Sequence, residues 1–213
     1  MKVSLAKICC LIFAWATATG YSQTLNWASL TESEIVDSYG NPLSNAYVFE
    51  LGAFTEGFVP DEGNIESWGS QWHVFDTADY SYSPSTLGVF TGSQDVQNVP
   101  GYSSMFEGLK AYIWIRKEAD NEHFLASTSS NKWTFPLLVP GCCPNGEGAT
   151  WSVSDLNADA PVWGGQLGNE GAGQHFISGS FDIQTYAIPE TGSSLLTLVG
   201  LGLAIARRRR NAE

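Results

Sequence analysis

GLKAYIWIRK, residues 108–117, is the stretch that decides the fold. In an extended chain, successive side chains point to opposite faces. One face would carry Ala111, Ile113 and Ile115, and the other Tyr112, Trp114 and Arg116. This alternation predicts a strand at the centre of a sheet, with one wholly apolar face turned toward a core.

Short segments of similar character surround this stretch. Residues 35–54 are expected to form a strand, a turn at 37–42 and a second strand, because Asp37, Gly40, Asn41 and Pro42 are turn formers. Further strands are predicted at 85–93, 123–128, 132–138, 150–155, 161–165 and 180–188. Many short strands at this spacing indicate an all-β fold, a sandwich or jelly-roll-like single domain.

One short helix is expected after residue 60. Asn64 can cap it, and Ile65, Trp68, Trp72 and Phe75 follow at helical spacings of three, four and three. A tryptophan stripe with this spacing is typical of a helix that packs on a core.

The N-terminus has the three parts of a secretory signal peptide. Lys2 and Lys7 precede an apolar run over 8–16, which is too short for the roughly 20 residues of a spanning helix. Ala18 and Gly20 fit the −3 and −1 positions of a cut before Tyr21, and Gly20 and Ser22 fit those of a cut before Gln23. We expect residues 1–22 to be removed on export, which leaves an exported β-rich domain over 23–187.

The C-terminus, residues 188–213, also has three parts in a fixed order. An apolar run over 195–206 lies between a turn-forming motif and an arginine cluster. The motif is Ile188, Pro189, Glu190, Thr191 and Gly192, and the cluster is Arg207, Arg208, Arg209 and Arg210. A helix counted from Gly192 would rise only about 22 Å, against a hydrocarbon core of about 30 Å. Such a segment is typical of a transient stop in the membrane, with the arginines held on the cytoplasmic side.

This C-terminus resembles a PEP-CTERM sorting signal. The resemblance implies an exosortase-like membrane protease as partner, transient or permanent inner-membrane association, and delivery to the cell surface or an extracellular exopolysaccharide matrix. Thr191 departs from the family pattern, which usually has a second proline there. The resulting IPETG also resembles the Leu-Pro-x-Thr-Gly motif of sortase substrates, so a cut between Thr191 and Gly192 is the alternative. Residues 24–165 resemble uncharacterised domains of PEP-CTERM proteins from Verrucomicrobia and related bacteria, which implies an origin but no activity.

Charge excludes one class of partner. Residues 23–190 keep four basic residues against 21 acidic ones. A chain with this excess of negative charge repels polyanions, so we expect no nucleic-acid partner. Solubility in an extracellular setting would account for the acidic composition. The alternative is a specific function, the capture of calcium or other counter-ions.

Two small features bear on redox and metal chemistry. Cys142 and Cys143 are adjacent, so a disulfide between them would stiffen one turn and add little stability; an intermolecular bridge and two free thiols are the alternatives. Asp155, Asn157 and Asp159 alternate like the start of a calcium loop, although the rest of an EF-hand pattern is missing. Calcium is the one cofactor that this pattern suggests.

Catalytic signatures are missing from the sequence. His73, His123 and His175 are isolated, and Glu118 and Asp120 lie in a segment expected to be a solvated hairpin loop. We therefore expect no enzyme.

Aromatic residues support a binding role instead. Seven tryptophans lie outside the signal peptide, and Trp151 and Trp163 flank the acidic turn as a candidate glycan-contacting pair, with packing inside the core as the alternative. The predicted function is an exported, structural or adhesive surface protein. The alternative is a secreted carbohydrate-binding module with calcium support.

Overall fold

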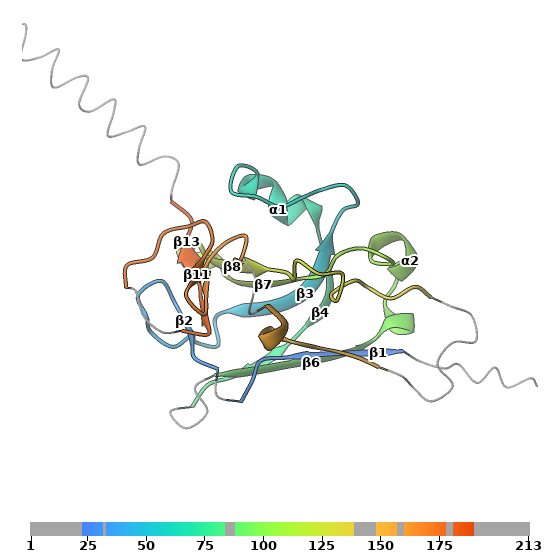
Figure 1. Cartoon of the computed structure of the whole chain (residues 1–213), viewed down its shortest axis with the longest axis horizontal. Coiled ribbons are helices and arrows are strands. Elements are labelled where there is room, and N and C mark those ends of the chain that lie inside the picture. Colours follow the sequence, from blue (N-terminus) through green and yellow to red (C-terminus); the bar gives the residue numbers. More distant parts are fainter. Residues whose placement is uncertain are drawn as a thin grey trace, which may run out of the picture.

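A computed structural model describes residues 23–31, 33–83, 88–138, 148–156, 160–177 and 181–189. The described chain is mostly β and forms three sheets (Figure 1). The central sheet has the strand order β13 (Tyr186–Ala187), β8 (Glu122–Ala126), β7 (Tyr112–Lys117), β3 (Val48–Phe54) and β4 (Trp72–Thr77). The facing sheet has the order β5 (Asp79–Ser81), β6 (Val89–Asp95), β1 (Thr24–Ala28) and β9 (Ala149–Ser152). The side sheet has the order β11 (Asn169–Glu170), β10 (Gly165–Gln166), β12 (Ile183–Gln184) and β2 (Ile35–Val36).

The prediction of a central strand in residues 108–117 is confirmed over 112–117, while Lys110 before it forms only an isolated bridge. β7 lies in the middle of the central sheet and pairs antiparallel with β3 on one side and β8 on the other. Its alternating side chains therefore have neighbours on both faces of the sheet.

The inner face of the central sheet packs on the facing sheet. Ile113 and Ile115 lie in one continuous buried core with Leu51 and Phe124 of the neighbouring strands and Phe90 of β6. Figure 1 shows β1 and β6 lying below β3 and β7, which matches this two-layer arrangement. Burial of so much apolar surface between two sheets supplies the main driving force for folding.

The outer face has a separate and smaller aromatic core. Phe54, Tyr112 and Trp114 point to this side and meet Trp68 of α1 (Ile65–Gln71) and Trp163. The Trp68 ring meets Trp114 and Trp163 edge to face, at centroid distances of 6.0 and 6.2 Å. The helix α1 lies over the outer face in Figure 1, on the side away from β1 and β6.

The expected helical stripe is wrong beyond residue 71. Asn64 is the N-cap residue of α1, but Trp72 and Phe75 belong to strand β4. Backbone pairing with β3 overrides the helical spacing, since Trp72 lies opposite Phe54 in the antiparallel ladder. Gly52 makes this possible, because a Cβ there would lie 2.6 Å from the Trp72 ring.

The other expected elements are confirmed in part. The turn after β2 forms as predicted, with the Asn41 N–H bonded to Asp37 Oδ1 at 2.8 Å and Gly40 at a φ of +79°. Residues 132–138 form no strand; one isolated bridge joins Thr134 to Lys110, and the buried Trp133 fills the core. Residues 153–156 form the 3-10 helix η4 (Val153–Leu156) directly after β9, where a continuous strand is expected over 150–155.

Other elements are not predicted from the sequence: β1, β5, β11, the short helix α2 (Tyr102–Met105) and the 3-10 helix η2 (Val96–Asn98). The expectation of a single helix is therefore wrong, because α2 is a second short helix. Within the described ranges, no helix is long and apolar enough to cross a membrane.

A buried carboxylate joins the side sheet to the central sheet. Glu122 is only 3% exposed, although the sequence places it beside a predicted solvated loop. It accepts hydrogen bonds from the Ser38 N–H at 3.2 Å, from the Ser38 hydroxyl, and from Thr185 Oγ1 at 2.6 Å. The loop itself, η3 (Glu118–Asp120), has exposed carboxylates as expected. Glu122 thus ties together three segments that lie far apart in the sequence.

Candidate functional site

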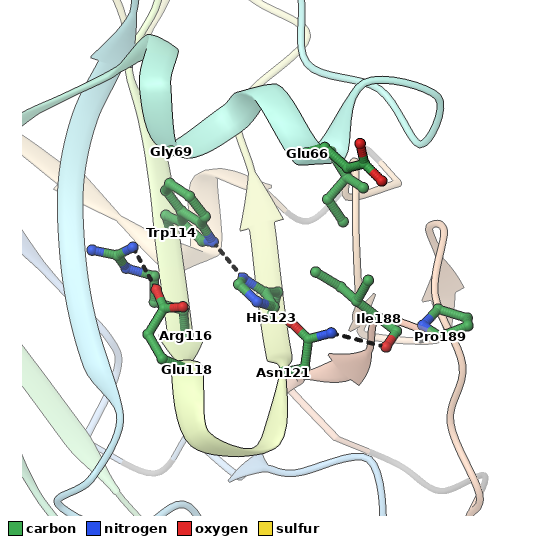
Figure 2. A pocket seen from close by; sticks show the side chains of 10 residues that line it. Glu66, Gly69, Trp114, Arg116, Glu118, Asn121, His123, Ile188 and Pro189 are labelled. Atoms are coloured by element: carbon green, nitrogen blue, oxygen red, sulfur yellow. Dashed lines mark hydrogen bonds and ion pairs between the residues drawn. The ribbon is translucent and has the colours of Figure 1, made fainter. Parts of the chain in front are cut away.

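A pocket of about 450 Å³ opens on the outer face of the central sheet. Figure 2 shows α1 above it, strands β7 and β8 behind it, and the chain after β13 at its rim. The residues that line it are Ile65, Glu66, Gly69, Trp114, Arg116, Glu118, Asn121, His123, Ile188 and Pro189. The pocket therefore draws on four segments that only the fold brings together.

Arg116 is the charged centre of the pocket. Its guanidinium bonds Glu118 Oε1 at 2.7 Å and Glu50 Oε1 at 3.2 Å. The Glu50 side chain is 8% exposed, and its second oxygen accepts a hydrogen bond from Trp72 Nε1 at 2.9 Å. A buried carboxylate needs such partners, because burying an unpaired charge is costly.

The same guanidinium stacks on an aromatic ring. The Arg116 Cζ lies 4.6 Å from the centroid of the Trp114 ring. Trp114 is only 3% exposed, and the edges of Trp68 and Trp72 meet it as well. Two carboxylates and one ring therefore hold the guanidinium in one orientation, with its plane fixed before any ligand arrives.

His123 is neutral, and its tautomer follows from its partner. Trp114 Nε1 can only donate, and it lies 3.0 Å from Nδ1 of His123, so Nδ1 is an acceptor and the ring proton is on Nε2. Burial, together with the positive charge of Arg116, lowers the pKa of His123 from 6.5 to about 4. Among the described residues, Nε2 has no hydrogen-bond partner.

The rim of the pocket is apolar on one side and open on another. Ile188 lies at the rim and is held by two hydrogen bonds with Asn121. Its N–H donates to the Asn121 carbonyl at 2.9 Å, and its carbonyl accepts from Asn121 Nδ2 at 3.1 Å. Ile65 forms the α1 side of this apolar wall. On the same helix, Gly69 leaves a gap, because a Cβ added there would meet no atom within 4 Å.

The pocket combines a fixed cation, a neutral histidine and exposed carboxylates. Arg116 donates to Glu118 and Glu50 through one N–H of each terminal nitrogen, and the neutral His123 can donate through one nitrogen only. Among the residues that the structure describes, no group of three or more His, Cys, Asp or Glu could hold a metal ion. The pocket therefore offers fixed donors, exposed carboxylates and an apolar wall.

The two tryptophans expected to contact a glycan lie elsewhere. Trp151 and Trp163 are each 4% exposed, and they belong to different cores on opposite faces of the central sheet. Trp151 stacks on Trp133 at 5.7 Å, and Trp163 Nε1 bonds the Tyr186 carbonyl at 3.0 Å. Neither ring offers a free face to a sugar, so the expected surface pair is corrected to two core residues.

The expected calcium ligand Asp155 is occupied by protein donors. Lys132 Nζ and Trp133 Nε1 bond its carboxylate, and the Ser152 N–H bonds it at 3.1 Å. Burial opposes ionisation, but these hydrogen bonds outweigh it and lower the pKa of Asp155. Asn157 and Asp159, the other two expected ligands, lie outside the described residues.

Other predicted residues are also outside the described ranges. These are Cys142, Cys143, Glu190, Thr191, Gly192, Arg207, Arg208, Arg209 and Arg210. From the expected sorting motif, Ile188 and Pro189 are described, and both line the pocket. No spacing in the sequence links them to Arg116 or His123, and the one signal for the site is a charged residue, Arg116, on the aromatic face of a central strand.

No protein-family model, curated protein or solved structure matches this chain. The chemistry of the site is therefore derived from its own residues.

Proposed function

We propose that this chain is an exported protein of the cell surface or extracellular matrix, with a structural or adhesive role. Its residues 188–213 are a sorting signal that an exosortase-like membrane protease reads. The exported body is a β-sandwich or jelly-roll-like domain, built from the facing and central sheets and extended by the side sheet.

The observation that carries this proposal is the position of the motif's first residues. β13 ends at Ala187, and within the described range 181–189 Ile188 still donates its backbone N–H to Asn121 while Pro189 is exposed. Since Pro189 has no N–H, it cannot extend the ladder of β13. The motif thus begins at the surface of the body, at a fixed point, and its remaining residues follow directly from there. A membrane protease needs such an accessible junction.

The surface role is supported by how the described body uses its polar groups. Its buried charged residues, Glu50 and Glu122, are paired with protein donors, and His123 is neutral and bonded to Trp114. The acidic residues outside the core, such as Glu66 and Glu118, are left to face solvent. A rigid body with a polar, negatively charged surface suits a protein displayed outside the cell.

Mass spectrometry of the exported protein tests the proposal. A mature C-terminus near Pro189–Thr191 is expected and would support sorting; within that range, an end at Thr191 would indicate sortase-type rather than exosortase-type processing. In a variant with Arg207, Arg208, Arg209 and Arg210 changed to Gln, we expect unprocessed chain to accumulate. The matched control changes Lys110, Lys117 and Lys132 of the body to Gln and leaves processing unchanged. An exported wild-type chain that keeps residues 207–213 would contradict the proposal.

A further inference from the structure

We infer that the pocket between α1, β7 and β8 binds one unit of a neutral saccharide, through hydrogen bonds on its polar side and C–H contacts on its apolar side. This inference rests on the adhesive part of the proposed function and gives it a site. It does not depend on the tryptophan pair that the sequence suggested.

The polar groups of the pocket require a ligand with both donors and acceptors. At neutral pH the carboxylates of Glu66 and Glu118 only accept hydrogen bonds. Arg116 and Nε2–H of His123 only donate. A sugar ring carries adjacent hydroxyls, and each hydroxyl donates and accepts, so one ring can satisfy both kinds of group.

One nitrogen of a pocket histidine has no protein partner. His123 lines the pocket, and among the described residues only its Nδ1 is hydrogen-bonded, so the N–H on Nε2 is left for a group inside the pocket. This N–H is open to solvent rather than buried, because the buried side-chain atom without a partner among the described residues is Gln166 Oε1. A ligand hydroxyl or ring oxygen in the pocket would supply the acceptor.

Charge selects a neutral ligand over an anionic one. The guanidinium of Arg116 is already neutralised by Glu50 and Glu118, and Glu66 adds a further negative charge at the rim. An acidic ligand would be repelled by this excess of negative charge, and the guanidinium of Arg116 is already paired. Repulsion therefore disfavours uronic acids and phosphates.

Shape agrees with a sugar-sized ligand. A pocket of about 450 Å³ lies within the usual range for small-molecule sites. Ile65, Ile188 and Pro189 form an apolar wall opposite the polar groups, as Figure 2 shows for Ile188 and Pro189. The C–H face of a pyranose ring can lie on such a wall while its hydroxyls meet Glu118, Arg116 and His123.

The gap at Gly69 gives a clean way to test the inference. Gly69 lines the pocket, and a Cβ added there meets no atom within 4 Å, so Gly69→Leu adds bulk at the pocket without a clash at its Cβ. The matched control is Ser67→Leu, which puts the same side chain on the same helix at an exposed position that does not line the pocket. Glu118→Gln is a second variant, which removes a carboxylate whose side chain is 71% exposed.

The full chain and these variants are applied to an array of neutral, N-acetylated and uronic-acid-containing oligosaccharides, and spermidine is titrated separately. We expect retention of at least one neutral oligosaccharide, a loss of at least tenfold in affinity in Gly69→Leu, a several-fold loss in Glu118→Gln, and no change in Ser67→Leu. Thermal melting of each variant shows that the fold is kept.

Four results would overturn the inference. These are no binding to any oligosaccharide, binding that survives Gly69→Leu, a preference for uronic acids, and tighter binding of spermidine than of any sugar. Each of them leaves the mature C-terminus seen by mass spectrometry untouched, so failure here is distinct from failure of the sorting proposal.

Discussion

The two faces of the central sheet use the same strands for different purposes. On the inner face, Ile113 and Ile115 are fully buried in the larger core, together with side chains of the facing sheet such as Phe90. On the outer face, Trp114 and Arg116 of the same strand lie beneath one short helix and one loop, and this cover leaves a pocket. The inner face shows how alternation holds a fold together, and the outer face shows how an incomplete cover creates a site.

The electrostatics of the two faces differ as well. The inner core is built from apolar and aromatic side chains, and the carboxylates that its Trp27 and Trp133 meet, Asp76 and Asp155, are only half-buried. The outer face holds Glu50, Arg116 and His123, each bonded to a tryptophan indole or stacked on one. Tryptophan rings, which carry an N–H donor, thus allow charged groups to lie close to a core and still have an interaction partner.

The largest effect is expected on the inner face. Ile115→Ala removes buried methyl groups and leaves a cavity between the sheets, so it should lower the free energy of unfolding by about 2–5 kcal/mol. Urea unfolding measures the change. If the loss were below about 1 kcal/mol, the inner face would not be the main source of stability. The comparison between the two faces would then break.

The second-largest effect is expected from acid, which should lower the free energy of unfolding through His123 on the outer face. The lowered pKa of His123 means that the unfolded chain takes up a proton below pH 6.5 while the folded chain stays neutral down to about pH 4. Stability should therefore be full above pH 6.5 and fall as the pH drops toward 4, by up to about 3 kcal/mol.

The measurement is thermal or urea unfolding at several pH values, with His123→Gln as the matched variant. Gln keeps an acceptor for Trp114 but does not titrate, so the slope between pH 4 and pH 6.5 should become shallower. Equal slopes in both proteins would show that His123 does not carry the response to acid.

The ion pair between Arg116 and Glu50 should contribute less. Arg116→Met keeps much of the apolar stem but leaves the buried Glu50 without its cation, and we expect a loss of about 2 kcal/mol. Adding Glu50→Gln should recover part of that loss, which a double-mutant cycle can measure. The control is Glu118→Gln at the exposed end of the network, where the expected loss is at most about 1 kcal/mol. Equal losses in Arg116→Met and Glu118→Gln would mean that burial of Glu50 has no special cost.

The smallest effect is expected at the roof of the pocket. Gly69→Ala replaces a flexible residue inside α1 with the best helix former at an open position, so it should stabilise the protein by about 0.5–1 kcal/mol. Differential scanning calorimetry should show a slightly higher Tm. A lower Tm would mean that the space above the pocket is not free.

Local alternation predicted the β architecture well. The pattern in residues 108–117 is enough to identify a central strand, and the turn at Asp37 follows from its residue types alone. The helix boundary failed because Trp72 and Phe75 fit a helical stripe and a strand equally well, and only pairing with β3 decides between them.

The site could not be predicted in the same way. Its residues come from α1, β7, β8 and the segment after β13, and no spacing in the sequence links Gly69, Arg116 and Ile188. Trp151 and Trp163 were expected at the surface because their number seemed too large for one core. The fold instead has two cores, one on each face of the central sheet, and each takes one of these rings.

The indole N–H signals of the tryptophans test most directly whether the outer face binds a ligand while the inner face only stabilises the fold. Trp114 and Trp72 donate to His123 and Glu50 beside the pocket, while Trp27 and Trp133 donate to Asp76 and Asp155 elsewhere. In a ¹H–¹⁵N NMR titration with a neutral oligosaccharide that the array retains, the signals of Trp114 and Trp72 should move and those of Trp27 and Trp133 should stay in place. Movement of Trp27 or Trp133 while Trp114 stays fixed would contradict the division between the two faces.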